Sequence, residues 1–186
     1  MALFYLIRHG QPDYSELETH GFFGFGRAFA PLSTKGIAQA ETTARDPRLK
    51  EAAFIVTSPY TRALQTAQII SRESGLEVKV DLDLHEWMPD MTNKLASGQE
   101  SALLAADFSA CKGTYPPGET RRWETLAHMR ARMRAVADRY ADYGCVIFVG
   151  HGMAFRTLAY IKHMQPAEII ECPYQSDQVD VDYCFE

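Results

Sequence analysis

Short apolar runs alternate along this chain with longer segments of helical periodicity. Residues 2–7 are an apolar run long enough for a buried strand and too short for a helix. Similar runs predict short strands over residues 53–56 and 145–149. Alternating apolar and polar residues predict two more strands, over 78–84 and, at the edge of the sheet, over 179–183. Strands are therefore expected through the whole chain rather than in one part of it.

Segments with the spacing of amphipathic helices lie between these strands. Ser33 is expected to cap a helix whose first turn contains Gly36, and a second helix is predicted over residues 61–73. A short helix is expected over 101–111, and the last buried strand is followed by a helix over 153–162. Strands that alternate with helices predict the α/β class with a mostly parallel central sheet.

The longest amphipathic segment is predicted to form a helix from Glu119 or Thr120 to about residue 143. Its apolar residues fall on one inner face: Trp123, Leu126, Met129, Met133, Val136 and Tyr140. Its arginines are expected to form the solvated side: Arg130, Arg132, Arg134 and Arg139. The less periodic segment before it, residues 87–120, is expected to be a lid over a pocket.

At 186 residues and 21.0 kDa, the chain has the size of one domain that buries about 70% of the surface its unfolded form exposes. The formal net charge of −5 argues against a nucleic-acid partner, because binding to a phosphate backbone needs clustered Lys and Arg. A local cationic pocket is compatible with that charge, so a small phosphorylated substrate fits the composition.

The four cysteines show neither a C-x-x-C pair nor the spacing of a zinc site. They are expected to be reduced thiols, with Cys145 buried in an apolar strand. No charged region precedes the first apolar run, and no apolar stretch is long enough to cross a membrane. We therefore expect a cytoplasmic protein without a membrane partner.

The candidate chemistry begins at the end of the first strand, where Arg8, His9 and Gly10 follow the apolar run. A parallel sheet places its ligand crevice at the carboxyl ends of its strands, so this position suits a cation and a nucleophile. Three later segments also stand at strand ends or helix starts: Thr57-Ser58-Pro59-Tyr60-Thr61-Arg62-Ala63, Leu84-His85-Glu86 and Val149-Gly150-His151-Gly152. They are expected to bring their polar side chains to the same edge of the sheet.

These residue types suit phosphoryl transfer. The guanidiniums of Arg8 and Arg62 and an imidazole donor from His151 fit the oxygens of a phosphoryl group. His9, with one ring nitrogen donating to a backbone carbonyl, can present the other as a neutral nucleophile. Glu86, kept protonated by partial burial, can give a proton to the leaving alkoxide and then activate the water that hydrolyses the phosphohistidine.

The two arginines supply positive charge of the kind that magnesium supplies in other phosphoryl-transfer sites, so neither a metal nor another cofactor is expected. A metal hydrolase that uses the same histidine and glutamate residues is the rival interpretation. The sequence contains no H-x-x-x-H or H-E-x-x-H motif in its favour.

In their order along the chain, the four segments resemble the site segments of the histidine phosphatase superfamily, which includes the phosphoglycerate mutase-like enzymes. Phe23-Gly24-Phe25 and the stretch 32–40 are similar to the F-x-G-W loop and the L-[ST]-x-x-G-x-x-Q-A helix start of that family. The resemblance implies a three-layer α/β/α sandwich with a small lid insertion. It also implies a phosphohistidine enzyme with catalytic His9, Glu86 and His151 and with phosphate-binding Arg8, Arg62, His151 and Gly152.

Within this family, the sequence favours a phosphatase. The resemblance implies that a mutase has an arginine-rich segment like E-R-x-Y-G starting at its catalytic Glu. In this chain Glu86 is followed by Trp-Met-Pro-Asp, and the first basic residue after it is Lys94. The chain is also short beside typical mutases. We therefore expect a metal-independent phosphomonoesterase acting on a phosphorylated small molecule, and the aromatic residues near 22–29 and at Trp87 hint at an organic leaving group. A mutase and a phospho-ligand binding or regulatory module without turnover are the alternatives.

Overall fold

The computed structural model describes residues 1–185 and contains a five-stranded sheet in the order β3-β2-β4-β1-β5. Four strands run parallel to one another: β1 (Ala2–Arg8), β2 (Ile55–Thr57), β3 (Val78–Val80) and β4 (Cys145–Gly150). β5 (Ile169–Tyr174) runs antiparallel to β1 at one edge. The prediction of a mostly parallel central sheet is confirmed.

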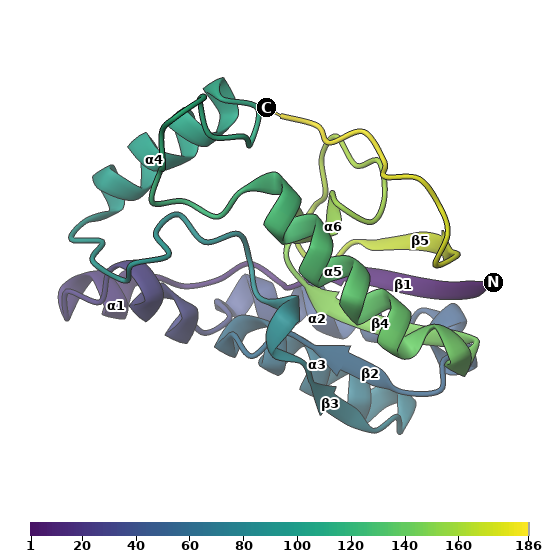
Figure 1. Ribbon diagram of the computed structural model, residues 1–186. Helices are drawn as coiled ribbons and strands as arrows, with labels where there is room; N and C mark the ends of the chain where they lie inside the picture. Colours follow the sequence, from purple (N-terminus) through teal and green to yellow (C-terminus); the bar gives the residue numbers. More distant parts are fainter. Residues whose placement is uncertain (186) are drawn as a thin grey trace.

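Helices lie on both sides of this sheet (Figure 1). On one side are α2 (Thr34–Ala44) and α3 (Thr61–Ser74), and on the other are α5 (Leu126–Tyr140) and the short α6 (Gly152–Phe155). α1 (Ser15–Thr19) and α4 (Gly98–Ala110) lie away from the sheet (Figure 1). Residues 1–185 also contain four 3₁₀ helices: Gly24–Phe29, Pro47–Glu51, Leu82–Leu84 and Ala141–Tyr143. None of the helices in residues 1–185 has the length and hydrophobicity that a membrane span requires.

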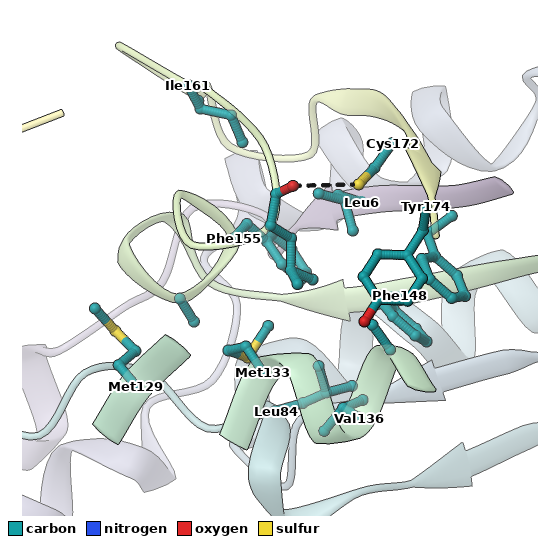
Figure 2. Close-up of a cluster of buried hydrophobic side chains, with 14 of the residues drawn as sticks. Leu6, Leu84, Met129, Met133, Val136, Phe148, Phe155, Ile161, Cys172 and Tyr174 are labelled. Carbon is teal, nitrogen blue, oxygen red and sulfur yellow. Dashed lines mark hydrogen bonds between the residues drawn. The ribbon is translucent and has the colours of Figure 1, made fainter. Parts of the chain in front are cut away.

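The apolar run of β1 divides between two buried clusters because successive side chains of a strand point to opposite faces. Phe4 and Leu6 join the larger cluster under α5 and α6, and Tyr5 and Ile7 join the cluster under α3. Figure 2 shows the larger cluster, to which α5, α6 and the strands β1, β4 and β5 all contribute side chains. Burying each large apolar side chain contributes roughly 1.5–3 kcal/mol, so the two clusters fix the sheet between its helices.

The predicted start of the long helix at residue 119 or 120 is wrong. The helix begins after Thr125, whose hydroxyl accepts the N–H of His128. Residues 119–125 form no helix, and two backbone hydrogen bonds connect them to residues 88–91, since Arg122 O accepts the N–H of Met91 and Glu124 N donates to Met88 O. Pairing with residues 88–91 therefore satisfies backbone groups that a helix would have satisfied internally.

The predicted edge strand over residues 179–183 is also wrong, since these residues form no strand and β5 lies at that edge of the sheet beside β1. The backbone of the tail bonds instead to side chains of α5, since Arg130 donates to Val181 O and Arg134 donates to Gln178 O. The helix predicted over 153–162 ends at Phe155 and continues as turns. Alternation of polar and apolar residues did not distinguish a strand from a segment held by arginines.

The arginines of α5 do not all lie in solvent. Arg132 is 7% exposed and forms an ion pair with the buried carboxylate of Glu124, which corrects the prediction of a solvated side. The error has a physical reason, because the inner face that contains Met129, Met133 and Val136 also contains position 132 at helical spacing.

Residues 87–120, the predicted lid, contribute α4 and connect to the rest of the protein through aromatic contacts. Phe108 of α4 is 1% exposed and packs against Trp87 and Trp123 at ring-centroid distances of 4.9 and 5.3 Å. Arg122 also pairs with the buried Asp90 at 2.6 Å. The lid remains a prediction, and these contacts fix both of its ends to each other.

Candidate active site

The carboxyl ends of three parallel strands meet at one level of the sheet. Arg8 of β1 stands beside Gly150 of β4, and Thr57 of β2 stands beside Val149. The residues that immediately follow these strands are His9, Ser58 and His151, and all three are buried. The predicted meeting of strand-end side chains is therefore found in the fold.

The loop after β1 is held by a close contact between glycines. A Cβ atom on Gly10 would lie 2.4 Å from Gly36 O, and one on Gly36 would lie 2.1 Å from Gln11 O. Ser33 caps α2 by accepting the N–H of Gly36, as predicted, and Gln39 accepts the N–H of Gln11. The start of α2 thus packs against the backbone that positions His9.

Arg62 in the first turn of α3 connects the two histidines. Its Nε donates to Nε2 of His9 at 3.0 Å, and its Nη2 lies 3.4 Å from Nδ1 of His151. Nη1 donates to the carbonyl of Arg27 at 3.1 Å. The side chain is 6% exposed, so this guanidinium is a buried cation at the centre of the site.

The hydrogen bonds define the proton positions on both imidazoles. A guanidinium has donors and no acceptor, so the nitrogens that face Arg62 must accept: Nε2 of His9 and Nδ1 of His151. Nδ1 of His9 donates to Gly10 O at 2.7 Å, and Nε2 of His151 donates to the hydroxyl of Ser58 at 2.8 Å. Each ring therefore presents a lone pair to the centre of the site.

Burial, and then the charges of Arg62 and Arg8, lower the pKa of His9 from 6.5 to about 3. Burial and the neighbouring His9 and Arg62 likewise place the pKa of His151 well below its ordinary value. Both imidazoles are neutral at neutral pH, so His9 has the protonation state that a nitrogen nucleophile needs.

This pKa makes the stability of the protein depend on pH. Between pH 6.5 and about 3, His9 binds a proton in the unfolded chain and none in the native state, so the free energy of unfolding falls as the pH falls. Between pH 6.5 and 4, we expect the free energy of unfolding of His9→Ala to depend less steeply on pH than that of the original protein, by at most about 1.4 kcal/mol per pH unit. Urea denaturation at several pH values measures the slope, and equal slopes for both proteins would contradict a neutral native His9.

Glu86 lies opposite the start of α6. Its Oε1 accepts the N–H groups of Trp87 and Ala154 at 2.8 and 3.0 Å, and its Oε2 accepts that of Met153 at 3.3 Å. The half-buried side chain is thus held in place by the segment that follows His151. The sequence predicted Glu86 at the end of a strand over residues 78–84. The strand is shorter, because β3 ends at Val80 and a 3₁₀ helix follows it.

Arg8 points to the same side as α6. Its Nη1 donates to Met164 O, its buried Nε has no hydrogen-bond partner in the structure, and a Cβ atom on Gly152 would lie 3.8 Å from that Nε. Arg8 and Gly152 are therefore neighbours, while His9, Arg62 and His151 form the connected centre.

A cavity of about 190 Å³ opens beside this centre and contains both Arg62 and Glu86 in its wall. The wall combines aromatic and cationic side chains with small residues: Tyr14, Gly24, Arg27, Ala28, Tyr60, Trp87, Pro89 and Ser101. The guanidinium of Arg27 lies 3.9 Å from the ring centroid of Tyr14. The cavity thus offers an apolar and cationic surface next to the imidazoles.

Histidine, cysteine, aspartate and glutamate side chains do not gather in groups of three or more that could hold a metal anywhere in residues 1–185. The charged groups that surround His9 are the guanidiniums of Arg8 and Arg62. The donor set at the strand ends suits an anion, since guanidinium forks match the oxygens of a phosphoryl group.

Several polar residues of the site had no role in the sequence prediction. Ser58 accepts from His151, and Thr66 accepts the N–H of Gly10 while its hydroxyl donates to Arg62 O. Thr66 stands one helical turn after Arg62, a spacing that places both on the same face of α3. Helical spacing could have identified it once Arg62 had been chosen.

Known proteins that are similar to this chain are phosphatases and phosphoglycerate mutase-like proteins. The family model of the histidine phosphatase superfamily (branch 1) matches residues 4–179. “Putative phosphoserine phosphatase 2” of Hydrogenobacter thermophilus is 38% identical over 86 residues, which are 46% of this chain and 40% of that protein. “Probable phosphoglycerate mutase GpmB” of Proteus mirabilis is 26% identical over 166 residues, covering 85% of this chain and 73% of that protein.

Solved structures share the fold at low sequence identity. A mycobacterial glucosyl-3-phosphoglycerate phosphatase in complex with VO3 superposes with a TM-score of 0.68 at 23% identity and 92% coverage of both chains. A phosphoglycerate mutase from Bacillus anthracis gives a TM-score of 0.67 at 20% identity, covering 94% of this chain and 88% of that one. The fold is therefore common to phosphatases and mutases.

Proposed function

We propose that this chain, which belongs to the histidine phosphatase superfamily, is a phosphomonoesterase that works through a phosphohistidine on His9. The observation that carries this proposal is the lone pair on Nε2 of His9, held 3.0 Å from the Nε of a buried arginine. A neutral imidazole whose other nitrogen donates to a carbonyl is prepared for nucleophilic attack. The adjacent guanidinium attracts the anion that this nucleophile would attack.

Substrate binding begins with a change of partner for Arg62. Its Nε–H and Nη2–H face ring nitrogens in the free protein, and a phosphoryl oxygen is a stronger acceptor for them. The phosphoryl group takes over these donors, and Arg8 contributes its buried Nε–H from the other side. Nε2 of His9 is thereby released toward the phosphorus atom.

Phosphoryl transfer then proceeds in line. Nε2 of His9 forms a bond to phosphorus while the bond from phosphorus to the ester oxygen breaks, and Glu86 gives its proton to that oxygen. The negative charge beside His151 favours the imidazolium form, which donates from both nitrogens and stabilises the equatorial oxygens. Gly152 lies beside Arg8 at the same position of the site.

Hydrolysis of the phosphohistidine regenerates the enzyme. The carboxylate of Glu86 takes a proton from water, the water oxygen bonds to phosphorus, and the bond between phosphorus and Nε2 breaks. Inorganic phosphate leaves, and Glu86 has recovered the proton that it gave to the alcohol. The arginines provide the charge stabilisation, so the cycle requires no metal ion.

The cavity supports a compact organic leaving group. Its volume is about 190 Å³. Tyr14, Tyr60 and Trp87 give it flat apolar walls, and Arg27 adds a cation at a distance from the phosphoryl site. These features favour a small phosphorylated metabolite over a long phosphopeptide.

A phosphoglycerate mutase is the second candidate, and the similarity to the Proteus mirabilis protein over 85% of this chain favours it. The sequence after Glu86 argues for hydrolysis, because the next residue is the 6%-exposed Trp87, whose indole donates to Glu124 O. Incubation with 3-phosphoglycerate separates the two: a phosphatase releases inorganic phosphate, and a mutase forms 2-phosphoglycerate.

Activity is expected to be independent of metal ions. The positive charge at the phosphoryl group comes from Arg8 and Arg62, so hydrolysis of p-nitrophenyl phosphate should proceed at an unchanged rate after treatment with EDTA. Loss of activity with EDTA and recovery with zinc, manganese or magnesium would support a metal hydrolase instead. No hydrolysis of any tested phosphate ester would support the non-catalytic binding module.

The proton transfer by Glu86 predicts a dependence on the leaving group. Glu86→Gln should slow phosphorylation of the enzyme by glycerol 2-phosphate roughly 10²–10⁴-fold, because an alkoxide needs the proton. Phosphorylation by p-nitrophenyl phosphate should change little, because p-nitrophenolate leaves without one. Single-turnover kinetics are required, since slow hydrolysis of the phosphohistidine could hide the difference in kcat. Equal losses with both substrates would exclude Glu86 as the donor and direct attention to Asp83, Asp90 or Glu119.

A further inference from the structure

A buried ion pair lies behind Glu86, outside the wall of the cavity. Glu124 is 1% exposed and Arg132 is 7% exposed. Nε and Nη2 of Arg132 donate to the two carboxylate oxygens of Glu124 at 2.7 and 3.0 Å. Glu124 directly precedes the cap residue Thr125, and Arg132 lies near the middle of α5.

The remaining donors and acceptors of this pair go to the backbone on both sides of Glu86. On the preceding side, Nη1 of Arg132 donates to Asp83 O at 2.6 Å and to His85 O at 2.8 Å. On the following side, Oε2 of Glu124 accepts the N–H of Met88 at 3.3 Å. One ion pair therefore holds residues 83–88 at both ends.

The backbone of Glu124 strengthens the second attachment. Its N–H donates to Met88 O at 2.9 Å, and its carbonyl accepts the indole N–H of Trp87 at 2.8 Å. His128 completes the environment, with Nδ1 donating to Oε1 of Glu124 at 2.9 Å. Every oxygen of the Glu124 side chain thus bonds to a group that is fixed by α5 or by the segment around Glu86.

Stability alone does not explain this arrangement. A buried ion pair loses its hydration, and well-packed apolar residues in its place often give a protein that is equally or more stable. The carbonyls of residues 83 and 85 are acceptors that a backbone helix or strand could have satisfied. Their bonds to one guanidinium determine the position of the backbone directly before Glu86 instead.

We propose that Glu124 and Arg132 are positioning residues that hold Glu86 at the ester oxygen of the substrate, a role that rests on the proposed proton transfer by Glu86. A general acid works only within hydrogen-bond distance of the atom that it protonates. The carboxyl group of Glu86 accepts the N–H groups of Met153 and Ala154. The ion pair holds the backbone next to Glu86 through the bond from Arg132 to the carbonyl of residue 85.

The test removes both charges together. The double variant Glu124→Gln/Arg132→Met avoids leaving one uncompensated buried charge, which single substitution would do. Single-turnover phosphorylation is then measured with glycerol 2-phosphate and with p-nitrophenyl phosphate. We expect a loss of about 10–100-fold with glycerol 2-phosphate, as for a displacement of the acid by about 1 Å, and a loss under about threefold with p-nitrophenyl phosphate. The Kd of inorganic phosphate should stay within about twofold of the original value.

Matched variants separate positioning from folding. Leu49→Ala removes a fully buried side chain from the cluster under α3, which includes none of residues 83–88. This variant should lower the thermal midpoint and leave the ratio of the phosphorylation rates with the two substrates unchanged. Arg132→Lys keeps the charge and loses the planar fork, so it should shift the ratio of the two phosphorylation rates less than the double variant does. It replaces the double variant if the double variant does not fold.

Two further results decide the proposal. In the Glu86→Gln background the double substitution should cause little additional loss with glycerol 2-phosphate, because the proton is already absent. If Glu86→Gln discriminates between the substrates and the ion-pair variants do not, the positioning role is wrong and the proposed function stands. If Glu86→Gln itself does not discriminate, the proton-transfer step fails and the positioning role fails with it.

Discussion

Replacing His9 with alanine is expected to abolish turnover, lowering kcat by at least about 10⁴-fold for every phosphate ester. The substitution removes the atom that we propose bonds to phosphorus, and the other buried imidazole, of His151, presents its lone pair to Arg62 from a different strand end. Stopped assays with p-nitrophenyl phosphate measure the loss.

The His9→Ala protein should still fold. His9 is 5% exposed, but its partners are polar groups, Arg62 and Gly10, rather than the apolar clusters. Loss of the acceptor for the Nε of Arg62 should lower the free energy of unfolding by about 1–3 kcal/mol at neutral pH. His163→Ala, at an exposed position, is the matched control and should retain full activity. Activity of His9→Ala within tenfold of the original would refute the nucleophile assignment.

Arg62→Ala is expected to have the second largest effect, with kcat/KM lower by about 10³-fold or more. The guanidinium faces both imidazoles and is 6% exposed, so water cannot replace its fork without opening the site. Its charge stabilises the bound phosphate and, more strongly, the transition state in which negative charge develops. The Kd of inorganic phosphate and kcat should therefore both deteriorate.

Two variants of α3 sharpen this result. Arg62→Lys keeps a charge and loses the planar fork, so it should recover phosphate affinity more than turnover. Arg72→Ala, at an exposed position on the same helix, should change neither quantity. An increase in KM with unchanged kcat for Arg62→Ala would mean that Arg62 binds substrate and transition state equally and does not assist the chemistry.

The sequence predicted the centre of this site because its elements are short and local. Residues 2–7 could only be a strand, the Ser33 cap and the first turn of α3 follow from local residue types, and parallel strands bring their carboxyl ends together. The position of His9 beside His151 follows from the register of β1 and β4. Short-range patterns were sufficient for these parts.

Long-range side-chain bonds lay beyond such patterns. Arg132 was expected in solvent because arginine usually lies there, although its spacing from Met129 and Val136 placed it on the buried face. Its partner Glu124 precedes the helix cap, and the two carbonyls to which Arg132 donates lie 49 and 47 residues earlier in the chain. The tail around Val181 was misjudged for the same reason, since Arg130 determines its backbone path.

The electrostatics of the site also depended on the fold. The sequence shows two arginines and two histidines, but the low pKa of His9 comes first from burial, which only the packed structure provides. Likewise, the sequence could not reveal that both rings accept from one guanidinium, which fixes Nε2 of His9 as the unprotonated nitrogen.

The most direct measurement is the identity of the phosphorylated residue during turnover. Rapid quenching after mixing with ³²P-labelled substrate should trap phosphate that is stable in base and labile in acid, at up to one equivalent per chain, and peptide mapping should place it on His9. Ser58 is the sharpest competitor, since its hydroxyl lies 2.8 Å from Nε2 of His151 in a serine–histidine pair. An acid-stable phosphoserine at Ser58, or rapid turnover with no covalent adduct, would contradict the phosphohistidine mechanism.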